Sequence, residues 1–192
     1  MTKLDALNIM MNAIGSTPIT NADSPQNADA VIAKATLELT VKEIQAEKWW
    51  FNTEPGFTLT PNTEKKINIP TGIIHIDFTG RHGEQRNLAI RGEYLYDIDN
   101  HTFIFEKPVV ANVRLCLTFE EIPETAKLYA TARAARRFQD QVLCDTNAHS
   151  WTELDEATAR AKLTAEDIRQ TKPHFGIYPR LDPNVGIDLR FM

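Results

Sequence analysis

Cysteine is scarce in this sequence, which has only Cys116 and Cys144 in 192 residues, far apart and without Cys-x-x-Cys spacing. Two such residues cannot build a disulfide scaffold or a zinc knuckle. They suit a protein assembled in a reducing cytoplasm, with thiols that are buried or incidental to its function.

Long hydrophobic runs are also missing. No stretch approaches the roughly 18 uninterrupted apolar residues that a membrane-spanning helix needs. Residues 1–5 lead into an amphipathic pattern rather than into the apolar segment of a secretory signal. We therefore expect a protein that neither spans a membrane nor carries a signal peptide.

An excess of positive charge is absent as well. The chain has 21 basic and 26 acidic residues, a net charge of -5. By segment, residues 1–48 carry +4 and -6, residues 49–122 carry +7 and -10, residues 123–172 carry +8 and -8, and residues 173–192 carry +2 and -2. No segment is net basic, so the sequence predicts no general attraction to nucleic acid.

Catalytic and metal-binding motifs are not found. There is no GxSxG, no HExxH and no glycine-rich phosphate loop. Asp97, Asp99 and Asn100 resemble the start of a calcium loop, but the glycine at its sixth position and the glutamate at its twelfth are missing, which favours an Asx turn. The histidines are scattered: His75, His82, His101, His149 and His174. We expect no enzymatic activity, no metal and no cofactor.

Four segments have helical periodicity, and the first two lie near the N-terminus. Thr2 can cap the first helix together with Asp5, and Gly15 suits its end. The pair Ser24 and Pro25 predicts the start of a long second helix that ends near residue 48. The apolar face expected for this second helix comprises Ala28, Val31, Ile32, Ala35, Leu39 and Ile44.

The third and fourth helices are predicted in the C-terminal half. The third begins after Pro123, where Glu120, Glu121 and Glu124 are better explained as negative charge at a helix N-terminus than as an acid–base pair. Its expected buried stripe is Leu128, Ala132, Ala135, Phe138 and Val142. The fourth runs from about residue 148 to 172, with an expected stripe of Trp151, Leu154, Ala161, Ala165 and Ile168. Four such helices predict a bundle.

The segment between the second and third helices has β character. Short runs at 56–60, 73–78, 94–96, 103–105 and 113–117 are separated by Pro, Gly, Asn and Asp. They predict an antiparallel sheet of five or six strands. The clearest hairpin is 94–105, with a polar tip at 97–101 whose substitution we expect folding to tolerate.

These elements predict an α+β chain in three parts. Residues 1–48 and 123–172 form a four-helix bundle, and residues 49–122 form an antiparallel β domain inserted between helices two and three. Residues 173–192 form an extended, proline-broken arm whose large apolar side chains must dock on another surface. These side chains are Phe175, Ile177, Tyr178, Leu181, Val185, Ile187, Leu189 and Phe191.

One concentrated basic cluster, Arg133, Arg136 and Arg137, lies on the predicted third helix. A nucleic-acid site would call for interleaved aromatic residues or more positive surroundings. A solvated or inter-subunit salt-bridge face is favoured instead. Similarly, Trp49-Trp50-Phe51 is expected to be core at the junction of bundle and sheet rather than a base-stacking platform.

Several sequence blocks, in this order and spacing, resemble one family along nearly the whole chain. They are Ile14-Gly15 followed by Thr17-Pro18-Ile19, Asn27-Ala28-Asp29-Ala30, Lys48-Trp49-Trp50-Phe51-Asn52, Arg91-Gly92-Glu93-Tyr94-Leu95-Tyr96-Asp97, Glu121-Ile122-Pro123-Glu124 and Arg137-Phe138-Gln139. The chain resembles tail tubular protein A, the head-to-tail adaptor of short-tailed bacteriophages. It differs from longer members in a shorter hairpin tip and a proline-rich tail.

The resemblance implies a structural virion protein, assembled in the host cytoplasm and located in the tail. It implies a homo-oligomeric ring of twelve copies below the portal protein, with DNA passing through the lumen. The bundle and the arm would contact the portal or a neighbouring copy, through Arg133, Arg136 and Arg137 and through the apolar residues of 173–192. The β domain would contact the nozzle, tail tubular protein B, and the tail fibres, through Asp97, Asp99, Asn100 and His101.

Two other classes remain open at this point. A small nucleic-acid-binding regulatory protein would need a basic face, and a hydrolase would need a pocket with an activated side chain.

Overall fold

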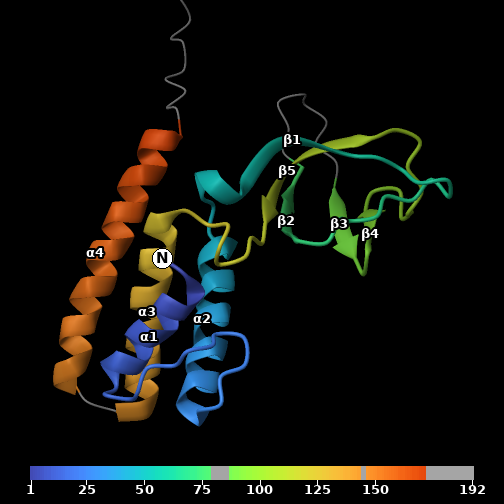
Figure 1. The fold of residues 1–192 in the computed structure, drawn as a ribbon. Helices are drawn as coiled ribbons and strands as arrows, with labels where there is room; N and C mark the ends of the chain where they lie inside the picture. The colour runs from blue at the N-terminus through green and yellow to red at the C-terminus, as the bar shows by residue number, and fades with distance from the viewer. Residues whose placement is uncertain (79–86, 144–145, 172–192) are drawn as a thin grey trace, which may run out of the picture.

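The computed structural model describes residues 1–78, 87–143 and 146–171, with side chains from residue 152 onward in the last range. Four helices surround one hydrophobic core: α1 (Lys3–Ala13), α2 (Ala28–Ala46), α3 (Glu124–Leu143) and α4 (Thr146–Gln170). A small antiparallel β region lies between α2 and α3 in the chain and extends to one side of the helices (Figure 1). The predicted α+β class and the position of the β segment are confirmed.

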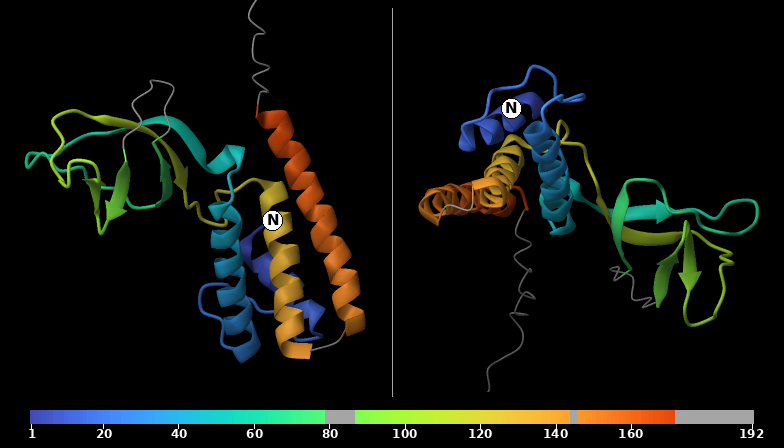
Figure 2. Two further views of the ribbon diagram at one scale, coloured as in Figure 1. Left: turned by 180° about the vertical axis from the view of Figure 1, so that it is seen from behind. Right: turned by 90° about the horizontal axis from the view of Figure 1, so that it is seen from below.

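The helices form an open layer rather than a closed bundle. Figure 2 shows α4, α3 and α2 in a row, with α1 lying over one face of the row. The central helix α3 packs against the other three, whereas α4 packs mainly against α3. As a result, α2 and α4 form the two edges of the layer and each keeps an uncovered outer face.

The first helix begins as its sequence predicts. The Thr2 hydroxyl accepts a hydrogen bond from Asp5 N at 3.1 Å, and the Asp5 carboxylate accepts one from Thr2 N at 2.9 Å. This capping box satisfies two backbone N–H groups that the helix itself leaves unpaired. Gly15 has a φ of +71°, the left-handed conformation expected after a helix end.

The predicted start of the second helix at Ser24 and Pro25 is wrong. Asn21 Oδ1 accepts hydrogen bonds from Asp23 N at 2.8 Å and from Ser24 N at 3.3 Å, an Asx turn that holds this segment out of helix. The helix begins at Ala28, where the Asn27 side chain accepts from Asp29 N at 2.9 Å. It ends at Ala46, two residues before the predicted end.

The apolar face expected for the second helix is mostly exposed. Val31, Ile32 and Leu39 are 51%, 45% and 57% exposed, and of the predicted set only Ile44 is buried. The core side of α2 instead comprises Ala30, Ala33, Leu37, Thr40, Val41, Ile44 and Gln45. Because α2 has apolar residues on both faces, periodicity reveals its helical character but not which face is covered.

The stripes of α3 and α4 need the same correction. In α3, Leu128 and Val142 are exposed and Ala132 is half-buried, while Ala135 and Phe138 are buried as predicted. The core positions of α3 also include Ala126, Tyr129, Ala130, Thr131, Ala134 and Gln139. In α4, Leu163 is the inward anchor, and Leu154 and Ile168 face outward at 62% and 66% exposure. The side chain of Trp151 lies outside the described residues.

Five strands are described, in two sheets rather than one. Strands β1 (Thr53–Leu59), β5 (Val109–Leu115) and β2 (Ile73–Asp77) form a sheet in that order, and both outer strands are antiparallel to β5. Strands β3 (Leu88–Arg91) and β4 (Tyr94–Asp97) form a separate two-stranded sheet. A second hydrophobic cluster, including Leu59, Ile67, Leu95, Phe105 and Val113, fills this region.

The predicted 94–105 hairpin is wrong in its pairing. The partner of β4 is β3, joined by a tight turn at Gly92, where φ is +64°. No strand forms over the described residues 103–105; a single bridge joins Asp97 to Thr102. Two backbone hydrogen bonds between Asp97 and Thr102, at 2.9 and 3.2 Å, close this loop in place of a longer ladder.

The predicted core position at the junction of helices and sheet is confirmed for Trp49, whereas Trp50 and Phe51 are half-buried. Trp49 is 6% exposed and belongs to the helical core. Trp50 and Phe51 pack against that core, and their two rings contact each other edge to face with centroids 5.1 Å apart. Gln45 makes a two-way amide clasp with Leu117, donating at 2.9 Å and accepting at 2.6 Å. This clasp joins the end of α2 to the segment after β5.

Candidate assembly surfaces

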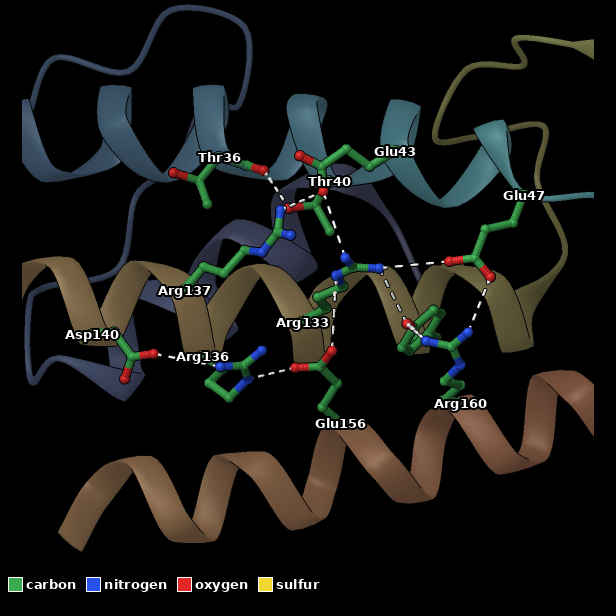
Figure 3. Close-up of polar contacts among 11 residues, drawn as sticks. Thr36, Thr40, Glu43, Glu47, Arg133, Arg136, Arg137, Asp140, Glu156 and Arg160 are labelled. Atoms are coloured by element: carbon green, nitrogen blue, oxygen red, sulfur yellow. Dashed lines mark hydrogen bonds and ion pairs between the residues drawn. The ribbon is translucent and has the colours of Figure 1, made fainter. Parts of the chain in front are cut away.

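The arginine cluster predicted on the third helix lies between α2 and α4. Figure 3 shows α3 in the middle, with Arg133, Arg136 and Arg137 reaching acidic side chains of both neighbouring helices. All three side chains are partly covered, at 20%, 24% and 30% exposure. The structure thus brings the three predicted residues together and gives each a partner within the same chain.

Arg133 is the centre of this ion network. Its guanidinium lies 3.7 Å from Glu43 and 3.8 Å from Glu47 on α2, and 3.8 Å from Glu156 on α4. Beneath it, the hydroxyl of the fully buried Tyr129 accepts a hydrogen bond at 3.3 Å. One cation therefore holds both edge helices to the central one.

The remaining pairs complete the network. Arg137 donates to Glu43 at 2.6 Å, and Arg136 donates to Glu156 and lies 3.5 Å from Asp140. The hydrogen bond to Glu156 raises the pKa of Arg136 above its usual range. On α4, Arg160 reaches Glu47 at 3.2 Å. Four arginines thus face four carboxylates.

This balance determines what the network can do. Charge-assisted hydrogen bonds of this kind position helices relative to one another. Phosphate binding needs cations that are not already neutralised by acidic neighbours. The network therefore favours a packing role over DNA recognition, in line with the sequence-based interpretation. Its contact with a neighbouring subunit or the portal stays a prediction.

Sequence reasoning missed the acidic residues that α2 and α4 contribute to the network. Glu43 and Glu47 are four residues apart on α2, as Arg133 and Arg137 are on α3, so each pair lies on one helix face. This matching spacing was the available signal. Nothing comparable in the sequence pointed to Glu156, because its pairing depends on the arrangement of α4 against α3.

The loop predicted to face the distal tail is only partly exposed. Asp97 is 8% exposed and accepts hydrogen bonds from both the backbone N and the side-chain amide of Asn100, each at 2.9 Å. Asp99 accepts from the Asn87 amide at 2.9 Å, and His101 has a φ of +51°. For Asp97, this burial and these hydrogen bonds argue against the expectation that folding tolerates substitution of every tip residue. Asp99, Asn100 and His101 are exposed.

Other predicted features fall outside the described residues. They are Cys144, His82, His174 and the arm residues Phe175, Ile177, Tyr178, Leu181, Val185, Ile187, Leu189 and Phe191. Within the described ranges, no three His, Cys, Asp or Glu residues are grouped as a metal would require. Among the helices described, none combines the length and apolar character needed to cross a bilayer.

Comparison with known proteins decides the family. A family model described as tail tubular protein matches residues 4–173, which include α2, α3, α4, the whole β region and all but the first residue of α1. The chain belongs to the tail tubular protein family. It is also similar to tail tubular protein A of Klebsiella phage KP34, at 24% identity over 157 residues, covering 81% of this chain and 82% of the relative.

Membership in the tail tubular protein family sets the broad role. The chain is a structural component of the phage tail and is part of the virion, where it assembles with other tail components. It is not an enzyme, which removes the hydrolase hypothesis. The ion network and the covered Asp97 are accordingly to be understood as parts of a building block.

Proposed function

We propose that this protein is the head-to-tail adaptor of its phage. Twelve copies form a ring that joins the portal protein to the nozzle, tail tubular protein B, and to the tail fibres. The ring lines part of the channel through which DNA is ejected. The helical layer, 1–48 and 123–172, docks on the portal; the β region, 49–122, faces the distal tail; and 173–192 is an arm that docks on the portal or a neighbour.

The observation that carries this proposal is a family match that spans two differently built parts held firmly together. Besides the Gln45–Leu117 clasp, Trp50 N donates to Asp167 of α4 at 2.8 Å, and Asn52 donates to Gln45 O at 2.7 Å. These bonds tie the start of the β region to both edge helices. An adaptor needs such a connection because it has to transmit the position of one partner to the other.

Charge supports a channel in which DNA slides. A basic wall would bind phosphates and slow the genome, whereas this chain carries -5 overall and its arginine cluster is neutralised by carboxylates. The same observation disfavours a nucleic-acid-binding regulatory protein. Duplex DNA affinity at physiological salt should be negligible in the parent and in a variant with Arg133, Arg136 and Arg137 changed to alanine.

The adaptor role is tested in particles made without this protein. Heads should package DNA but lack nozzle and fibres and leak their genome, and adding purified protein should restore both components in order. Particles without the protein that still hold a full nozzle and fibres would contradict the proposal. The Glu54→Gln variant changes an exposed residue that is not among the predicted interface residues, and it serves as the positive control for restoration.

A further inference from the structure

Two apolar stripes remain uncovered on the helical layer, one on each edge helix. The outer stripe of α2 consists of Ala28, Val31, Ile32, Ala35, Leu39 and Ala46, and the outer stripe of α4 consists of Leu154, Ala157, Ala161, Ala165 and Ile168. Both repeat at helical spacing on the side away from α3. Both stripes combine alanine with large apolar residues, and the three successive alanines of the α4 stripe allow another helix to approach closely.

The two stripes face opposite directions, and the helices that carry them run parallel to each other. At one level Glu43 of α2 and Glu156 of α4 both contact Arg133. Further along, Glu47 of α2 contacts Arg160 of α4, and Trp50, which follows α2, contacts Asp167 of α4. Residue numbers rise together on both helices, so α2 and α4 are parallel. Figures 1 and 2 show them at opposite edges of the row with α3 between them.

We infer that the outer stripe of α2 in one copy packs against the outer stripe of α4 in the next copy. This inference rests on the proposed ring and assigns its lateral contact. Two different surfaces at opposite edges form a heterologous contact, which repeats around an axis and generates a ring when the rotation closes. A two-fold dimer would instead pair one stripe with itself.

Heights along the layer match across this contact. Glu43 and Glu156 lie at one level because both meet Arg133. At 1.5 Å per residue, Leu39 is about 6 Å and Leu154 about 3 Å below that level, so the two leucines lie within roughly 3 Å in height. Apolar side chains from the two copies therefore meet without a large shift of one copy along the helix axis.

Charge complementarity supports the same pairing. Lys42 and Asp155 each precede the reference glutamate by one residue, so they share a level, and the helical spacing places each beside its stripe on the side away from the ion network. Both are exposed. Among the described residues neither forms a salt bridge, and the charge of Lys42 acts on Glu38, one turn earlier on α2. In the proposed contact Lys42 of one copy faces Asp155 of the next.

The size of the contact explains why it would form only in a complete assembly. A stable interface between two proteins buries about 800 Å² on each partner. One pair of helix stripes with five large side chains offers less than this, so two isolated copies are not held together. When the ring closes on a portal, every copy gains a second contact, with the portal itself. That contact also aligns the α2 and α4 stripes of neighbouring copies.

Cysteine pairs test the contact in a background where Cys116 and Cys144 are changed to serine. Leu39→Cys and Leu154→Cys are made separately, assembled on portal rings, and treated with a short bis-maleimide. A mixture of the two variants should give covalently linked dimers, and either variant alone should give none. The double variant should give a ladder that extends to the full ring. Ile9→Cys, at an exposed site of α1, is the matched control and should not link to Leu154→Cys.

The outcomes separate the inference from the function on which it rests. Unmodified protein that forms no ring on the portal in negative-stain images contradicts the adaptor ring itself. Rings that form without Leu39-to-Leu154 links, or with links between like variants, overturn the α2–α4 contact alone. Leu39→Glu provides a second readout: the monomer should keep its melting temperature because the site is exposed, and ring formation should fall at least tenfold. Unchanged ring formation would also overturn the contact.

Discussion

At the residue scale, side chains that look interchangeable in the sequence have unequal roles. Among the polar residues at 97–101, Asp97 is covered and closes the loop through Asn100, while His101 is exposed. Among neighbouring acids of α4, Glu156 is 16% exposed and bonded to Arg136, and Asp155 is exposed. These contrasts allow matched substitutions that separate packing from surface effects.

The loop provides the first prediction. Asp97→Ala should lower the free energy of unfolding by about 1–2 kcal/mol, because the Asn100 backbone and amide groups lose a charged acceptor. His101→Asn should stay within about 0.5 kcal/mol, since asparagine tolerates a positive φ. Urea titration followed by tyrosine and tryptophan fluorescence measures both. Equal stability of the two variants would contradict the structural role of Asp97.

The ion network of α2, α3 and α4 provides the second prediction. Glu156→Gln should destabilise the chain by about 1 kcal/mol, because Arg136 and Arg133 lose a shared carboxylate in a partly solvated site. Asp155→Asn removes the same charge one residue earlier and should change stability by less than about 0.5 kcal/mol. Thermal unfolding by circular dichroism compares them. If Asp155→Asn lost as much stability as Glu156→Gln, the net charge of α4 and not the ion network would control stability.

At the scale of elements, the sequence predicts whether a segment is helix or strand better than it predicts which face of that element is buried. The capping box of α1 depends on local chemistry between Thr2 and Asp5 and was predictable. The buried face of α2 was not, because apolar residues occur on both sides of it and tertiary packing selects one. Likewise β3 was missed as a separate strand, since its pairing with β4 depends on the turn at Gly92 rather than on a long apolar run.

Acidic pH should weaken the attachment of α1. The backbone hydrogen bond from Thr2 lowers the pKa of Asp5, and the hydrogen bond from Lys3 lowers the pKa of Glu38 on α2. A carboxylate whose pKa is lowered in the folded state stabilises that state above its unfolded pKa of about 4, and this contribution disappears as pH falls through the folded pKa. The melting temperature should therefore drop between about pH 5 and pH 2.

A double variant isolates this effect. Asp5→Asn with Glu38→Gln should show a smaller drop in melting temperature over that pH range than the parent protein. Glu54→Gln, an exposed acid of β1 with no ion pair among the described residues, should behave like the parent. Identical drops in all three proteins would rule out these two carboxylates as the source.

The C-terminal segment is the element with the most specific predicted role. Truncation after Lys172 should leave circular dichroism unchanged, because the helices and strands that supply the described members of both hydrophobic clusters all end before residue 173. Portal attachment should be lost, since proline-spaced apolar side chains suit docking in pockets, and heads should lack tails and leak DNA. A truncated protein with unchanged affinity for the portal would contradict the docking arm.

At the scale of the whole molecule, an ordered series of individually weak sequence blocks predicted the family correctly, because together they span both parts of the fold. The ion network was half predictable, because three of its arginines cluster in sequence whereas Glu43, Glu47 and Glu156 come from two other helices. Which surfaces remain uncovered could not be predicted, because that depends on how four helices share one core. Those surfaces are the ones that an assembling protein uses.

Sedimentation velocity with and without purified portal rings tests the central claim, a ring built on the portal, most directly. The protein alone should sediment as a small species at all accessible concentrations. With portal, a complex should appear whose added mass corresponds to one copy per portal subunit, with no intermediate of comparable abundance. Protein that never cosediments with portal would contradict the adaptor ring, and a large stable ring formed without portal would contradict its dependence on the portal as template.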